Sequence, residues 1–184
     1  WRQQAVADHY LGRLDGVVWR VTLGVDGAPL AFDSIHPCGC YHLFFPTARV
    51  VAKPPEATLD EQALVPATLP AVATGAEVVV HVESGTHQVR AVRVGEAPQP
   101  VRYRLGRDDA LRALPHPGGG TRSLYGPNGR VAGTSRAEAA LLWPLGIEDA
   151  GAMRQWGRHV TAFVGRRHFD EAFLLDRYFA PAPR

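Results

Sequence analysis

The sequence predicts a β-rich α+β domain, mostly antiparallel, built as a sandwich or a partly closed barrel with short flanking helices. Several apolar segments rich in β-branched and aromatic residues are separated by turn pairs such as Asp26-Gly27 and Ser84-Gly85. Strands joined by such short turns pair in an antiparallel sense. Helical periodicity is confined to short stretches, so helices are expected only at the two ends and between the later strands.

The N-terminal part is expected to form one helix and then a hairpin. Residues 2–14 place apolar side chains at helical spacing, which predicts a short amphipathic helix. Segments 17–23 and 29–35 are apolar and flank the Asp-Gly pair, a combination typical of a β-hairpin. The extended pattern resumes at 41–45.

The middle of the chain holds the clearest hairpin. Residues 46–70 contain five prolines, which favours an extended surface excursion over a long regular element. Residues 77–94 form two β-branched segments around Ser84 and Gly85, which predicts a hairpin. A further strand is expected at 101–105.

The remaining segments alternate between helical patterns, turn-rich stretches and a strand. The expected elements are a helix at 107–114, a long loop at 115–130, a helix at 135–142, a strand at 158–165 and a closing helix at 170–179. Ser135 and Glu138 form the pattern of a capping box, and Asp170 is the expected cap of the last helix.

Composition favours one folded domain over residues 1–184. With 184 residues, 46% of them hydrophobic and 21% charged, the chain has enough apolar material for one substantial core. A net charge of +2, with arginines spread along the sequence, predicts no nucleic-acid partner. No apolar run reaches the ~20 residues of a membrane span, so a soluble chain without one is expected.

The first residue leaves the compartment open. The sequence begins at Trp1 and not at a methionine, which indicates a processed chain or a fragment of a longer one. A removed export signal, an upstream domain or a protein partner is therefore compatible with the sequence.

The stretch from Ser34 to Phe45 carries the strongest functional signal. It contains both cysteines of the chain and two histidines, and these four side chains occupy alternate positions: His36, Cys38, Cys40 and His42. In a straight strand they would share one face but extend over ~20 Å, too far to bind one metal ion. Pro37 and Gly39 provide for a bend that would bring them together.

These residue types predict a metal-binding domain as the leading hypothesis. Thiolate and imidazole are ligands that suit zinc or copper. A further ligand is expected from the hairpin at 77–94, with His87 beside its turn as first choice and His81 as second. The expected ligand set is His36, Cys38, Cys40, His42 and His87. Such a metal would be structural, handled as cargo, or able to activate water for hydrolysis.

Other functions remain open from the sequence. Cys38 and Cys40 could form a strained, easily reduced disulfide in a thiol-dependent redox protein. One of them could instead be an acyl-transfer nucleophile with a histidine base, oriented by Asp33 or Asp170. The cysteines could also be plain core residues of a non-catalytic interaction module. Whether the protein is an enzyme is undecided at this level.

Overall fold

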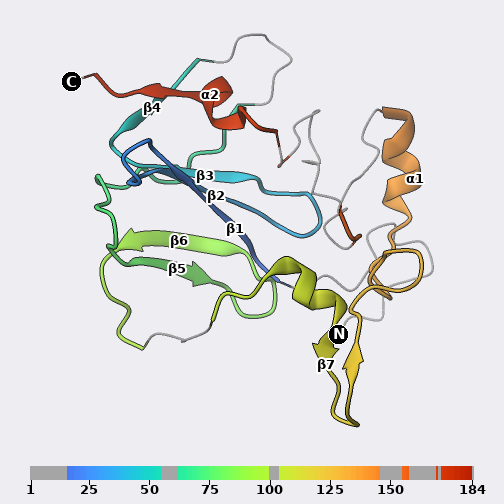
Figure 1. Ribbon diagram of the computed structural model, residues 1–184. Helices are drawn as coiled ribbons and strands as arrows, with labels where there is room; N and C mark the ends of the chain where they lie inside the picture. Colours follow the sequence, from blue (N-terminus) through green and yellow to red (C-terminus); the bar gives the residue numbers. More distant parts are fainter. Residues whose placement is uncertain are drawn as a thin grey trace.

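A three-stranded antiparallel sheet occupies the middle of the molecule (Figure 1). The structure is a computed structural model that describes residues 16–54, 62–99, 104–145, 155–157, 169 and 171–183. The sheet consists of β1 (Val18–Leu23), β2 (Pro29–Ile35) and β3 (Leu43–Pro46), in the order β1-β2-β3. These strands match the predicted segments at 17–23, 29–35 and 41–45.

The turn between β1 and β2 forms for the predicted reason. Gly27 has a φ of 75°, a left-handed conformation that glycine adopts without steric cost. The Gly24 N–H donates to the Ala28 carbonyl and closes the turn. The predicted hairpin is therefore confirmed.

Three further two-stranded pairs surround the central sheet, all antiparallel. They are β5 (Val78–Val82) with β6 (Val89–Val94), β4 (Val50–Ala52) with β9 (Phe179–Pro181), and β7 (Leu114–Pro115) with β8 (Thr121–Arg122). The first confirms the hairpin predicted at 77–94. Within the described ranges the sheets stay separate and none closes, so the chain is β-rich while the sandwich or partly closed barrel stays a prediction.

The helices are shorter than the sequence suggested. They are the 3₁₀ helices η1 (Asp108–Arg112) and η2 (Trp143–Leu145) and the α-helices α1 (Glu138–Leu142) and α2 (Leu174–Tyr178). The expected helix at 2–14 and strand at 158–165 lie outside the described residues, as does most of 101–105. No helix in the described part of the chain has the length and apolar character to cross a membrane.

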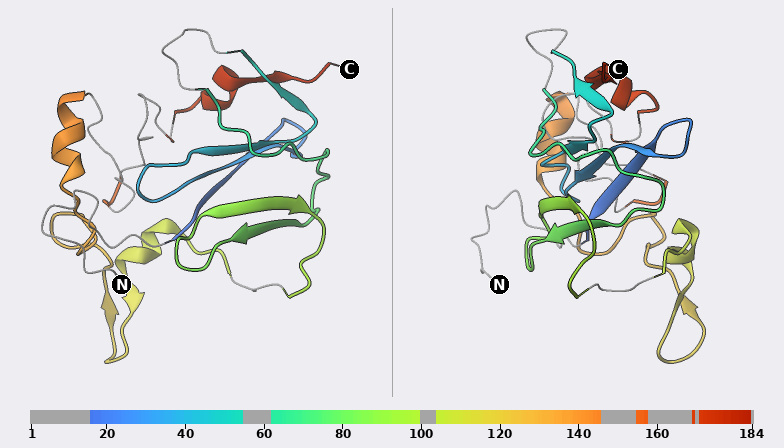
Figure 2. Two further views of the ribbon diagram at one scale, coloured as in Figure 1. Left: turned by 180° about the vertical axis from the view of Figure 1, so that it is seen from behind. Right: turned by 90° about the vertical axis from the view of Figure 1, so that its left-hand side faces the viewer.

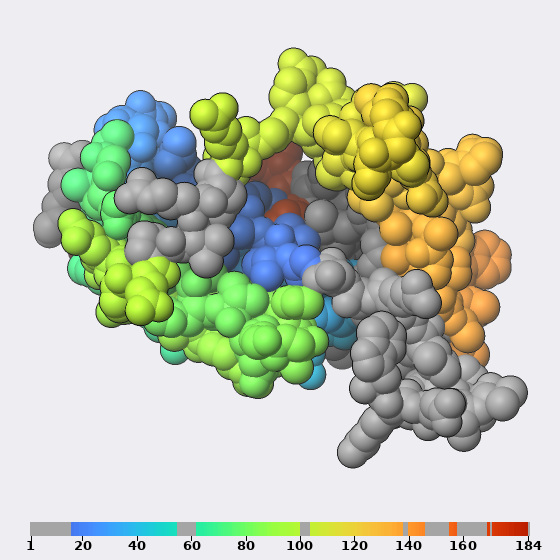
Figure 3. All heavy atoms as spheres, turned by 90° about the horizontal axis from the view of Figure 1, so that it is seen from below, coloured from blue at the N-terminus to red at the C-terminus, as the bar shows by residue number. Residues whose placement is uncertain are grey.

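The central sheet is covered on both faces (Figure 2). Neighbouring residues of a strand point to opposite sides, and β3 shows the consequence. Phe45 packs in a cluster with Val89 and Val92 of β6, whereas Phe44 packs in another cluster with Leu174 and Phe179. Figure 3 shows the green β5–β6 hairpin lying against blue β1 on the first of these sides.

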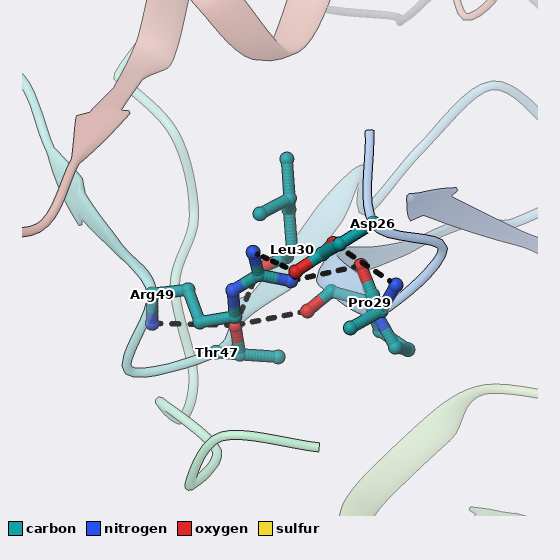
Figure 4. Close-up of polar contacts among 6 residues, drawn as sticks. Asp26, Pro29, Leu30, Thr47 and Arg49 are labelled. Carbon is teal, nitrogen blue, oxygen red and sulfur yellow. Dashed lines mark hydrogen bonds and ion pairs between the residues drawn. The ribbon is translucent and has the colours of Figure 1, made fainter. Parts of the chain in front are cut away.

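The loop after β3 is tied to the first hairpin by a polar cluster (Figure 4). The Arg49 guanidinium donates to both carboxylate oxygens of Asp26, over 3.1 and 2.8 Å, and to the Ala28 carbonyl over 3.1 Å. The hydroxyl of fully buried Thr47 donates to the Leu30 carbonyl over 2.9 Å.

Segment 46–70 was expected to be a surface excursion, which is wrong for part of it. Thr47, Val50 and Leu69 are buried. The prolines interrupt regular structure, as expected, but apolar side chains between them reach the core.

Candidate functional site

The His/Cys stretch forms the end of the β2–β3 hairpin. The Gly39 N–H donates to the His36 carbonyl over 2.8 Å, and the His36 N–H donates to the Cys40 carbonyl over 3.0 Å. Gly39 has a φ of 85°, as in hairpin loops that end in a left-handed residue. Pro37 suits the second position of such a turn because its φ is fixed. The predicted bend is present at these two residues.

Cys38 lies within this turn, and polar groups contact its sulfur. The His36 Nδ1 atom lies 3.0 Å from the Cys38 sulfur, and the Cys40 backbone N–H donates to the same sulfur over 3.2 Å. The Cys38 backbone N–H in turn donates to His36 Nδ1 over 3.3 Å. The Cys38 sulfur is therefore in hydrogen-bond contact with an imidazole nitrogen and a backbone N–H, and the whole residue is only 6% exposed.

The other nitrogen of His36 fixes its tautomer. Nε2 lies 3.0 Å from the Thr86 carbonyl oxygen, in the turn between β5 and β6. Because a carbonyl oxygen only accepts hydrogen bonds, Nε2 carries a proton. His36 Nδ1 and the Cys38 sulfur therefore share one proton between them.

This environment favours the thiolate of Cys38. The hydrogen bond from the Cys40 side chain is the largest cause, and His36 adds to it. Together they lower the pKa of the Cys38 thiol from 9.0 to about 4, although burial acts in the opposite direction. Both cysteines are free thiols in the structure.

His42 does not join this group. Its Nε2–H donates to Asp33 Oδ2 over 2.7 Å. Arg20 donates two further hydrogen bonds, of 2.9 and 2.6 Å, to the same carboxylate. His42 and Asp33 are each 2% exposed, and the imidazole stacks on Phe44 with ring centroids 4.3 Å apart. The alternating set is thus divided between the turn and the buried interior.

His87 lines a pocket together with His36, and the lining of that pocket contains neither cysteine. A pocket of about 210 Å³ opens between the end of the β2–β3 hairpin and the β5–β6 turn, and its lining includes His36, Tyr41 and His87. His81, the second choice from the sequence, accepts a hydrogen bond from Arg93 on the exposed part of β5. His81 lies five residues before Thr86, the residue whose carbonyl contacts His36.

Among the residues that the structure describes, no three His, Cys, Asp or Glu side chains gather in a way that could hold a metal ion. The predicted five-residue ligand set is instead divided into the Cys38 turn, the buried His42–Asp33 pair and the pocket with His87.

Sequence reasoning missed several residues of this region. Asp33 entered only as a partner for a thiol-activating histidine, whereas it pairs with Arg20 directly across β1 and β2. The available signal was a carboxylate in the middle of an apolar strand, which requires a buried partner. No comparable pattern in the sequence pointed to Tyr41 or to the Thr86 carbonyl as part of the site.

Within five residues the turn combines a cysteine whose lowered pKa favours the thiolate, a histidine in contact with its sulfur and a second thiol. A thiolate is the reactive form of cysteine in both nucleophilic and exchange chemistry. Comparisons with protein-family models, curated proteins and solved structures found no match for this chain.

Proposed function

We propose that the protein is a thiol-dependent redox protein in which Cys38 attacks an oxidised substrate and Cys40 completes the reaction. The observation that carries this proposal is the 3.0 Å contact between His36 Nδ1 and the Cys38 sulfur. When His36 takes the proton of the Cys38 thiol, Cys38 becomes a nucleophilic thiolate and His36 becomes a proton donor.

The reaction has two steps. In the first, the Cys38 thiolate attacks an electrophilic sulfur or oxygen atom, and the bond from that atom to the leaving group breaks. The leaving group takes the proton held by His36. In the second, the Cys40 sulfur attacks the Cys38 sulfur, the bond from Cys38 to the atom that it attacked breaks, and that group leaves with the Cys40 proton as the Cys38–Cys40 disulfide forms. Two electrons pass from the two thiols to the substrate.

The turn geometry supports Cys40 as the second thiol. Gly39 turns the chain between the two cysteines, and the Cys40 side chain already hydrogen-bonds to Cys38. A ring closed over one intervening residue is strained and therefore easily reduced. Such a bond suits repeated oxidation and reduction better than permanent stabilisation.

Acyl transfer receives less support. A catalytic histidine in that chemistry is commonly oriented by a carboxylate. Here Asp33 is engaged by Arg20 and His42, and His36 is oriented by a backbone carbonyl instead.

Zinc or copper binding is the second candidate. The hydrogen bond from His36 Nε2 to the Thr86 carbonyl favours it, because metal-binding histidines usually donate their other N–H to such an acceptor. His36 Nδ1 and the two sulfurs would be the donors. Within the described ranges these residues do not form a three-ligand group, so we rank this candidate below the redox function.

One experiment separates the two candidates. Protein purified without a metal-affinity tag is analysed for bound metal, then treated with the thiol oxidant diamide, and its free thiols are counted by alkylation and mass spectrometry. The redox function predicts little bound metal and loss of both thiols as an intramolecular disulfide. Cys38→Ser should abolish the reaction, and Cys40→Ser should stop it at a mixed adduct on Cys38.

The contrary results are equally specific. Stoichiometric zinc or copper that disappears in Cys38→Ser would favour the metal centre. A different result would be no bound metal together with two thiols that do not react with diamide, both in the unmodified protein and in the His81→Asn control. That result would indicate that the cysteines are inert structural residues and would exclude the redox function.

A further inference from the structure

The pocket beside His36 is the strongest unassigned feature of the described residues. It has a volume of about 210 Å³ and lies where the β2–β3 hairpin meets the β5–β6 turn. A cavity of ~150 Å³ holds benzene, so this one has room for a molecule moderately larger than that.

Backbone strain is concentrated at the same pocket. Tyr41 and His87 have φ values of 55° and 57°, and they are the two non-glycine residues with positive φ among those described. Both line the pocket. Left-handed backbone is unfavourable for side chains other than glycine, asparagine and aspartate, and such strain gathers at ligand sites. The two residues border one cavity from separate loops.

The walls favour an uncharged, apolar ligand. Val17, Ile35, Leu43 and Val89 provide most of the apolar lining. Arg90 also belongs to the wall, but the Glu83 carboxylate accepts two hydrogen bonds from its guanidinium and balances its charge. Nothing in this lining selects strongly for an anion.

His36 connects the pocket to the thiols. It belongs to the pocket wall, and its Nδ1 atom is in contact with the Cys38 sulfur. The pocket therefore borders the imidazole that contacts the Cys38 sulfur.

Resting on the redox function above, we propose that this pocket binds a small organic hydroperoxide with a compact apolar body, and that His36 protonates its leaving oxygen. A hydroperoxide releases an alkoxide, a poor leaving group that needs a proton, whereas a disulfide releases a stable thiolate. The proton donor at the pocket wall is therefore useful for a hydroperoxide in particular.

The chemistry balances without a further reactant. The Cys38 thiolate attacks the terminal peroxide oxygen, the O–O bond breaks, and the alkoxide takes the His36 proton to leave as an alcohol. Cys38 is then a sulfenic acid. The Cys40 thiol attacks its sulfur, water leaves, and the disulfide forms. One hydroperoxide and two thiols give one alcohol, one water and one disulfide; a small-molecule thiol would restore the reduced form.

The test compares two peroxides in single-turnover oxidation of the reduced chain. Cumene hydroperoxide carries an apolar aromatic body, and hydrogen peroxide carries none. Loss of free thiols is followed by quenching with an alkylating reagent and mass spectrometry. We expect cumene hydroperoxide to react about tenfold faster, because its apolar body is buried on binding, and to show a rate that saturates with concentration.

Two valine substitutions locate the effect. Val17→Phe adds an aromatic ring at the pocket and should lower the cumene hydroperoxide rate more than the hydrogen peroxide rate. Val25→Phe is the matched control, because Val25 is fully exposed in the β1–β2 turn outside the pocket. It should change neither rate.

Each failure points to a different proposal. Equal, non-saturating rates for the two peroxides, or an equal effect of both valine variants, would overturn the pocket assignment while the redox function stands. No oxidation by either peroxide and no disulfide with diamide would overturn both.

Discussion

His42 and Asp33 are joined by a hydrogen bond of 2.7 Å between two side chains that are almost fully buried. The bond divides the alternating histidines by role, because His42 is committed to the interior while His36 faces Cys38. Arg20 completes this buried group, and its guanidinium lies 4.0 Å from the centre of the Phe169 ring. The reactive turn is thus built on a polar group that fixes β1, β2 and β3 to one another.

The buried carboxylate should be important for stability. Asp33→Ala leaves Arg20 and His42 without their shared acceptor, and we expect the free energy of unfolding to fall by about 2–4 kcal/mol. Urea denaturation measures the loss. Asp26→Ala is the matched control, since it breaks an exposed pair with Arg49 and should cost much less. Equal losses in the two variants would show that the Asp33 group has no special role.

The Cys38 thiolate should persist at acid pH. Its pKa is lowered from 9.0 to about 4, so the thiolate absorbance near 240 nm that is lost in Cys38→Ser should titrate around pH 4. Because the folded-state pKa is the lower one, the thiolate's contribution to stability is fully present above pH 9.0 and is lost as pH falls toward about 4. A midpoint near the ordinary thiol value would contradict this environment.

Both partners of Cys38 should affect that titration. The hydrogen bond from the Cys40 side chain is the largest single cause of the lowered pKa of Cys38, and His36 adds a hydrogen bond and its charge, so Cys40→Ala and His36→Asn should each raise the midpoint. His81→Asn, which removes an exposed histidine outside the turn, should leave it unchanged. The pH dependence of iodoacetamide alkylation gives an independent measurement of the same shifts. An unchanged midpoint in Cys40→Ala or His36→Asn would contradict the role given to that residue.

Strain at Tyr41 predicts opposite effects of two substitutions at one position. Tyr41 is 59% exposed and has a φ of 55°, so its side chain loses little contact when replaced. Tyr41→Asn should leave stability unchanged or raise it, because asparagine tolerates this backbone. Tyr41→Val should lower it by about 1–2 kcal/mol. Urea denaturation of both variants measures the difference, and a similar loss in both would place the cost in side-chain contacts instead.

Local signals made much of the strand arrangement predictable. Asp26-Gly27 and Ser84-Gly85 mark turns whose backbone requirement is met within a few residues, so the two hairpins followed from the sequence. The pairing of β4 with β9 did not. It joins Val50 to Pro181, and neither three-residue strand has a sequence pattern that identifies its distant partner.

The sequence predicted which residue types make up the site but not which of them contact one another. Pro37 and Gly39 indicated the bend, and the alternating residues indicated reactive chemistry. Which histidine would meet a thiol depended on the register of β2 with β3 and on the position of the Thr86 carbonyl, both of which are set by tertiary packing. Spacing alone therefore grouped His42 with residues from which the fold separates it.

The partnership of β4 and β9 also has a consequence for how the chain is made. A ribosome synthesises the Cys38 turn and both of its flanking strands long before it reaches Phe179, which pairs with Ala52 and packs beside Phe44. Until then, one face of the central sheet lacks part of its cover. Cys38 and Cys40 therefore leave the ribosome before the sheet beside them is fully packed. Their premature oxidation during synthesis is a hazard that a reducing environment would limit.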